Sequence, residues 1–282
     1  MNSQTQHPAA LPTLSWPGLD QLRNLQPHWY YAGLVNFGVM VFCLLAMTVD
    51  DRTLQGVSVW AKPMKFGLSI GVYYLTLVWF SQYLRPGTLS TRAGHWLVGI
   101  PLVAGMAEIS YILVMAALGQ ASHYNFSSSF TITMYSLMGV GAVSMVAVLP
   151  WMAYLIGRYQ PLHHPLIFAI VVGLVLTCVL GGGYGMYLSG NDNHWVEATR
   201  TDANGLWLFN WARDGGDLRV AHFFGMHALH AFPLFALALN RVLPDGTRSH
   251  TQLAILIGFI CAYTAFSAIT FTQALQGQPF MG

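Results

Sequence analysis

The sequence predicts an all-α integral membrane protein: a single bundle of seven transmembrane helices with a long outer loop between the fifth and sixth helices. Only 8% of the 282 residues are charged, whereas a soluble domain carries about 25%. The mean hydropathy is +0.50. The chain also contains a series of apolar runs, each close to the roughly 20 residues that a helix needs to cross a bilayer.

These apolar runs occur in seven places, and each is a predicted membrane helix. All but one lack Asp, Glu, Lys and Arg, and the exception, the third run, contains Glu108. In chain order the runs are Trp29 to Val49, Phe66 to Leu84, Trp96 to Leu118, Tyr135 to Ile156, Pro165 to Leu188, Val220 to Leu239 and Leu253 to Ala274. In the fifth run, the small residues Gly181 to Gly183 predict a close helix approach or a break in the helix.

The chain divides into a tail, residues 1–28, and a transmembrane domain, residues 29–282. In the tail, Leu19, Leu22 and Leu25 recur at every third position, which predicts a short helix lying on the membrane surface. An ordinary tail is the alternative. The three cysteines stand alone inside predicted helices, so they form neither a disulfide framework nor a CxxC motif.

The predicted location is the cell membrane, with the N-terminus cytoplasmic and the C-terminus outside. In this topology Lys and Arg are equally frequent on the two sides. However, several outer ones lie in the long loop Gly190 to Arg219, where the positive-inside rule carries little weight. The predicted partner is the lipid bilayer. Nucleic acid is excluded, because the net charge is only +2 and no basic patch contains aromatic residues.

The sixth predicted helix concentrates polar groups in an apolar segment. Ionisable side chains within a membrane are costly, so they usually face the protein interior or a cavity. His227 and His230 are about 60° apart on a helix, a spacing that can serve one metal ion. The predicted metal ligands are His123, His222, His227 and His230. For each of them taken alone, a hydrogen-bonded interior position is the alternative.

Further polar residues are expected at the outer end of the same bundle. Glu108 shares a helix face with Tyr111, and we expect Glu108 and His227 to line a common cavity one third to half way through the membrane. The predicted catalytic residues are Glu108, Lys62, Lys65 and Tyr111, and the predicted cofactor-binding residues are Asn125, Asp217 and Arg219. Lys62, Lys65 and Arg219 could instead only extend to the membrane interface.

Three segments, WAKPMKFGLSIGVYY, SHYNFSSSFT and GDLRVAHFFGMHALHAFPL, resemble the signature segments of an uncharacterised family of bacterial multi-spanning membrane proteins. The resemblance implies a bacterial inner-membrane location but no activity. Similar proteins read HALQ where this chain reads His227-Ala228-Leu229-His230. The resemblance therefore favours His222 and His227 over His230 as essential metal ligands.

Three functions are compatible with these residues. The first is a membrane-embedded metal (Cu, Fe or Zn) or haem site that carries out redox chemistry on a lipophilic or small substrate such as a quinone, since neutral imidazole suits all these metals. The second is a proton- or ion-coupled transporter that uses Glu108 and the histidines of the sixth helix as a relay. The third is a membrane scaffold without catalysis.

Overall fold

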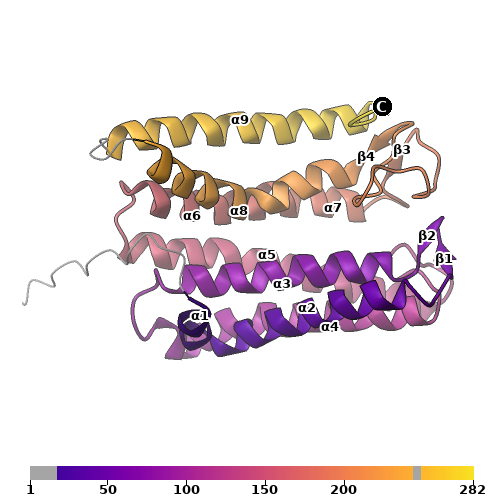
Figure 1. Ribbon diagram of the computed structural model, residues 1–282, viewed down its shortest axis with the longest axis horizontal. Helices are drawn as coiled ribbons and strands as arrows, with labels where there is room; N and C mark the ends of the chain where they lie inside the picture. The colour runs from indigo at the N-terminus through magenta and orange to yellow at the C-terminus, as the bar shows by residue number, and fades with distance from the viewer. Residues whose placement is uncertain (1–17, 244–248) are drawn as a thin grey trace, which may run out of the picture.

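The computed structural model describes residues 18–243 and 249–282, and in these ranges it is almost entirely helical (Figure 1). Of the predicted tail, residues 1–17 lie outside the described ranges. A short helix does follow, α1 (Leu19–Leu25), as the leucine spacing predicts. Its expected position on a membrane surface stays a prediction.

Six helical segments are long and apolar enough to cross a membrane. They are α2 (Pro27–Ala46), α4 (Arg92–Ala117), α5 (Ser129–Tyr159), the continuous segment Pro165–Ser189, α8 (Leu218–Val242) and α9 (Ser249–Leu275). The prediction of a helical membrane protein is therefore confirmed at this level. Each of these segments contains one of the predicted apolar runs or most of it.

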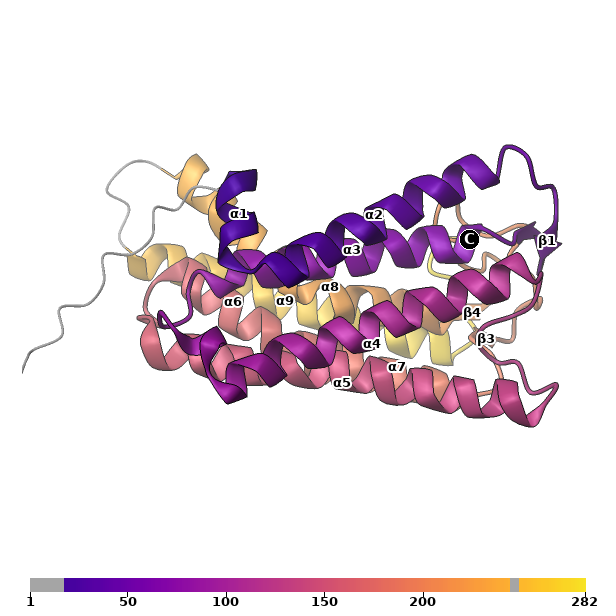
Figure 2. The same cartoon turned by 90° about the horizontal axis from the view of Figure 1, so that it is seen from below.

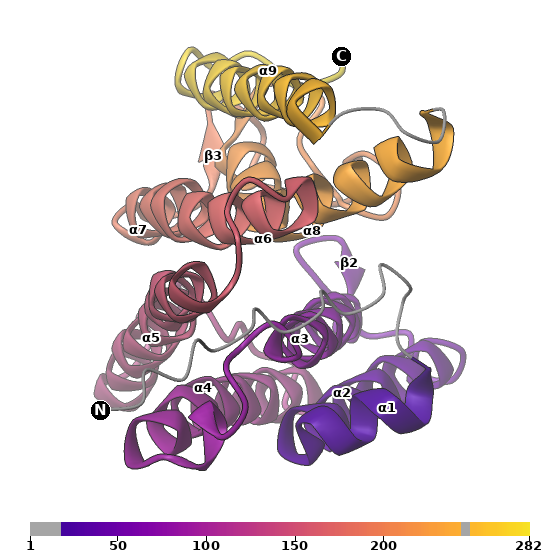
Figure 3. The same ribbon diagram turned by 90° about the vertical axis from the view of Figure 1, so that its left-hand side faces the viewer.

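The remaining long helix, α3 (Ala61–Ser81), is the most enclosed of the bundle. It lies between α2 and α4 on one side and faces α6 and α8 on the other (Figures 1 and 3). Its second half is almost completely buried, including Tyr73, Tyr74 and Trp79. α3 carries Lys62, Lys65 and several tyrosines, and it is not among the six segments that are apolar enough to cross a membrane.

The segment Pro165–Ser189 consists of α6 (Pro165–Leu176), a π-helical turn η2 (Thr177–Gly182) and α7 (Gly183–Ser189). The helix is not broken at Gly181 to Gly183; of the two predicted outcomes, the structure has the close helix approach, at Gly181. A side-chain carbon added at Gly225 of α8 would lie 2.7 Å from the amide nitrogen of Gly181, so the two backbones touch here. The π turn is stabilised by α8: Leu229 N donates to Thr177 Oγ1 at 2.9 Å, and His222 Nδ1 lies 2.9 Å from the Gly181 carbonyl oxygen.

The helices form two groups, α2 to α5 and α6 to α9, joined where α5 packs against α6 and η2 (Figure 1). At one end of the bundle lie the short hairpin of β1 (Thr53–Leu54) and β2 (Val57–Ser58) and the residues between α7 and α8 (Figure 2). We name residues 190–217 the cap segment; it contains β3 (Trp195–Val196) and β4 (Gly216–Asp217), which pair antiparallel. The 3₁₀ turn η1 (Thr88–Ser90) lies at the opposite end, just before α4.

Candidate functional site

A groove of about 710 Å³ runs along the side of the bundle between α4 and α5. From His95 to Tyr111 it follows α4 for sixteen residues, which corresponds to about 24 Å at 1.5 Å per residue. The groove is hollow partly because glycine lies in its wall: nothing is within 4 Å of a carbon added at Gly99. Its lining residues are apolar apart from a few, among them Glu108 and Tyr111.

The groove opens sideways rather than into the bundle. Val103 and Val140, which line it, are 69% and 68% exposed, and Leu137 beside them is 56% exposed. Apolar side chains exposed in this way on a membrane-type helix face the acyl chains of lipid. The groove therefore opens on the outer surface of the bundle, among exposed apolar side chains.

Glu108 stands near the end of this groove, on the inward face of α4, and is 8% exposed. Its Oε1 lies 3.5 Å from Nε2 of His123, which belongs to the connection between α4 and α5. His123 Nδ1 is in turn 3.2 Å from Ser122 Oγ. Burial, with the nearby positive charge of Lys62, holds the pKa of His123 well below its usual value of 6.5. The imidazole is therefore neutral at pH 7, and its two nitrogens can donate one hydrogen bond and accept another.

Two further polar groups lie around Glu108 without partners in the described part of the chain. Tyr111, one helical turn along α4, is 9% exposed, and its buried hydroxyl makes no hydrogen bond. The ammonium group of Lys62 makes no hydrogen bond or ion pair, but lies 5.9 Å from the centre of the Phe66 ring. Phe66 packs against His123 and against the cluster of buried side chains that includes Tyr111, so it links these groups between α3 and α4.

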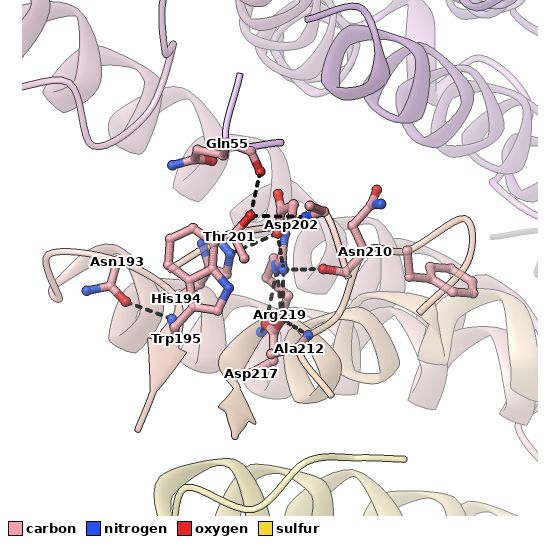
Figure 4. Close-up of polar contacts among 12 residues, drawn as sticks. Gln55, Asn193, His194, Trp195, Thr201, Asp202, Asn210, Ala212, Asp217 and Arg219 are labelled. Atoms are coloured by element: carbon pink, nitrogen blue, oxygen red, sulfur yellow. Dashed lines mark hydrogen bonds and ion pairs between the residues drawn. The ribbon is translucent and has the colours of Figure 1, made fainter. Parts of the chain in front are cut away.

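A second polar cluster connects the two groups of helices, with Arg219 at its centre (Figure 4). Arg219 forms ion pairs with Asp217 at 2.7 Å and with Asp202 at 2.9 Å. It also donates to the carbonyl oxygen of Asn210 at 2.7 Å, and the Asn210 side chain accepts a hydrogen bond of 2.7 Å from Lys65 on α3. The structure thus connects Lys65 with Arg219 through Asn210, a residue of the cap segment.

The cap segment is also fixed to the hairpin between α2 and α3. The carbonyl oxygen of Gln55 accepts hydrogen bonds from Asp202 N at 2.9 Å and from Thr201 Oγ1 at 3.2 Å (Figure 4). Asp217 accepts from the backbone amides of Ala212 and Arg219 and so caps the start of α8. This cluster therefore holds together the α2–α3 hairpin, the cap segment and the start of α8 at one end of the bundle.

His194 makes this cap segment sensitive to pH. Its side chain is buried beside Asp202, with Nε2 3.7 Å from Oδ1. Burial, assisted by Arg219, lowers the pKa of His194 below 6.5, although Asp202 and Asp217 oppose the shift. Burial would raise the pKa of Asp202, but its bonds to His194 and Arg219 outweigh this and lower it below 3.8, so Asp202 stays charged at mildly acidic pH.

We expect the cap segment to loosen as the pH falls from 7.5 to 5. A depressed pKa means that the unfolded segment binds a proton more readily than the folded one, so the stabilisation is complete above 6.5 and is lost as the pH falls below it. Hydrogen exchange of residues 190–217, corrected for the intrinsic pH dependence, measures this. His194→Gln should remove most of the change; an identical change in that variant would contradict the assignment to His194.

The four predicted metal ligands lie in three different places. His123 faces Glu108, and His222 contacts the π turn through Gly181. His227 and His230 do lie together, with their Nδ1 atoms 3.1 Å apart. Over residues 18–243 and 249–282, no group of three or more His, Cys, Asp and Glu side chains could hold a metal ion. The predicted site of four histidines is therefore not formed.

The cavity predicted for Glu108 together with His227 also needs correction. The groove at Glu108 is built from α4 and α5 and does not include His227. His227 instead packs on Phe223 of its own helix, with ring centres 4.2 Å apart. Asn125, predicted to bind a cofactor, uses its side chain in a local turn, donating to Ala121 O and accepting from Ser127.

The sequence did not predict which residues of the cap segment and of the α2–α3 hairpin bond to Lys65 and Arg219 or to each other. Asp202, Asn210 and the Gln55 carbonyl lie in irregular segments, where no periodicity indicates what they contact. Asp202 carried one usable signal, since a carboxylate within a long connection next to an arginine-bearing helix start is a candidate ion-pair partner. The groove left a weaker signal: glycines and alanines at Gly99, Ala104, Ala107 and Gly141 on facing helices.

Comparisons of the chain with family models, with curated proteins and with solved structures find no match. The fold therefore defines the class: a helical protein with six segments able to span a membrane. Within this class its distinguishing feature is a carboxyl group at the end of a laterally open apolar groove.

Proposed function

We propose that this is a multi-pass membrane protein that takes up a lipophilic molecule from the bilayer and presents the polar end of that molecule to Glu108. The observation that carries this proposal is the position of Glu108 in the α4–α5 groove. Sites for small molecules are mostly apolar, with a few placed polar groups that fix orientation. A groove about 24 Å long suits an extended acyl or isoprenoid tail.

In this proposal α3 is the seventh membrane span. Its 21 residues extend about 32 Å, enough for a hydrocarbon core of about 30 Å, and it runs alongside α2 and α4 (Figure 2). Seven spans put the two chain ends on opposite sides. We place the N-terminus in the cytoplasm and the cap segment outside, in the cell membrane.

Proton exchange is the chemistry that this site supports best. Glu108 contacts the groove on one side and His123 on the other, and His123 belongs to the connection near the cap segment. A proton can therefore pass between a bound molecule and the water at that end. A quinol is one molecule of this kind, because its hydroxyl group can release a proton. A metal or haem centre has less support here, because its predicted ligands are dispersed.

Proton-coupled transport is the second candidate, and the same Glu108–His123 contact favours it, since intramembrane carboxyl and imidazole groups are typical relay groups. Uptake into liposomes under a pH gradient distinguishes the two. Transport requires accumulation that Glu108→Gln abolishes. A scaffold role predicts instead that Glu108→Gln leaves every activity unchanged.

Filling the groove should abolish binding. In Gly99→Phe the new ring enters empty space, because no atom lies within 4 Å of the added carbon, so the helix stays folded while the groove is obstructed. A photoactivatable diazirine alkane, reconstituted with the protein in nanodiscs, should label α4 and α5 peptides in the wild type and at least tenfold less in Gly99→Phe.

The matched control is Gly139→Phe. Gly139 lies on α5, the other helix of the groove, and likewise has open space around it, but it does not line the groove. Labelling should persist in this variant. Equal labelling of the wild type and Gly99→Phe would show that the groove holds no ligand.

A further inference from the structure

The polar end of the groove contains a buried donor and a buried acceptor that are both incompletely bonded. The hydroxyl of Tyr111 has no hydrogen-bond partner among the described residues. The carboxyl group of Glu108 has only the 3.5 Å contact with His123, which is long for a hydrogen bond. A buried polar group without a partner is costly, and such groups in a folded protein call for an explanation.

The two groups can reach the same ligand atom. Glu108 and Tyr111 are three residues apart on α4, so they lie on one helix face, and both line the groove at its end toward the cap segment. Tyr111 can donate a hydrogen bond, and the Glu108 carboxylate can accept one. Lys62 lies near Glu108 without forming an ion pair, so its ammonium group leaves the carboxyl oxygens open to a ligand.

We infer that the groove selects molecules whose polar end is a hydroxyl group: a lipophilic alcohol, phenol or quinol. A single hydroxyl satisfies both groups, because its O–H donates to Glu108 while its oxygen accepts from Tyr111. An ether or ketone can only accept, and an alkane does neither. This inference rests on the proposed function, since it names the class of molecule that the groove takes.

The preference can be measured with competitors that share one chain length. Tetradecanol, its methyl ether and tetradecane compete with the diazirine alkane for α4 and α5 in nanodiscs. Wild-type protein should bind the alcohol at least about tenfold more tightly than the alkane, since the alcohol makes two hydrogen bonds at a buried site and the alkane makes none. The ether, bonded only by Tyr111, should fall between them.

Two variants measure how much Tyr111 and Glu108 each contribute to the preference for the alcohol. Tyr111→Phe should make the ether equal to the alkane, and Glu108→Gln should reduce the advantage of the alcohol over the ether. Ser110→Ala is the matched control on the same helix: Ser110 is exposed, and its hydroxyl donates to Met106 O. This variant should retain the wild-type order.

The outcomes separate the inference from the proposed function. If none of the competitors, the alkane included, reduces labelling of the groove, the proposed function is wrong. If all three compete equally well, the groove binds hydrocarbon without recognising a hydroxyl, and this inference alone is overturned. A preference that persists in both Tyr111→Phe and Glu108→Gln would overturn the assignment to these residues.

Discussion

Arg219→Leu should destabilise the protein by about 3–5 kcal/mol, the usual cost of removing one partner from a buried ion pair. Asp217 is 1% exposed and Asp202 is 7% exposed, so both carboxylates would lose their main counter-charge without gaining access to water. The carbonyl oxygen of Asn210 would also lose the hydrogen bond that it accepts from Arg219. Thermal unfolding in detergent measures the loss.

Arg213→Leu is the control for this variant. Arg213 belongs to the same cap segment, is exposed, and makes no ion pair in the part of the chain that the structure describes. It should change stability by no more than the few tenths of a kcal/mol typical of surface positions. Adding Asp202→Asn to Arg219→Leu should recover part of the loss, because it removes one of the stranded charges. If Arg219→Leu and Arg213→Leu unfold at the same temperature, the cluster does not stabilise the fold.

Gly225→Ala should be the other strongly destabilising change, by about 1–3 kcal/mol, as found when extra carbon is forced into a packed interface. The added carbon would lie 2.7 Å from Gly181 N and 2.9 Å from the carbonyl carbon of Leu180. Both contacts are with backbone, which cannot rotate aside, so α8 and the π turn must move apart. The same detergent unfolding measurement applies.

Gly258→Ala on α9 gives the matched comparison. Nothing lies within 4 Å of a carbon added there, and alanine is a better helix former than glycine by up to about 1 kcal/mol. This control should therefore be neutral or stabilising, opposite in sign to Gly225→Ala. Equal stability of the two variants would mean that the contact of α8 with the π turn can relax freely.

The helices were the predictable part of this fold because the bilayer imposes one simple rule on them. A spanning helix must be apolar for about 20 residues, and this leaves runs that are visible without any partner. α3 shows the limit of the rule. The apolar run Phe66 to Leu84 predicted most of this helix, but α3 begins earlier, at Ala61. Lys62 and Lys65 in its first turns interrupt the apolar pattern and hid this start.

The site was only half predictable, for a geometric reason. Helical spacing correctly placed His227 next to His230, with 3.1 Å between their Nδ1 atoms. The spacing of residues within one helix, however, does not predict which side chains a neighbouring helix places beside them. A metal site here would need ligands from more than one helix. The same limit applies to Glu108: its helix face was evident, whereas its contact with His123 depends on how the α4–α5 connection folds back.

The π turn at Thr177–Gly182 has a consequence for orientation. Because its hydrogen bonds run from residue i to residue i+5, the π turn contains one residue more than an α-helical turn. One residue corresponds to about 100° of rotation around the helix axis. Every side chain of α7 is therefore turned relative to α6 by an angle that an uninterrupted helix could not produce. In this rotated orientation Tyr184 and Tyr187 of α7 contact Phe271 of α9, with 4.6 and 5.3 Å between the ring centres. One residue in this segment thus acts as an angular spacer, setting which face of α7 meets the last helix.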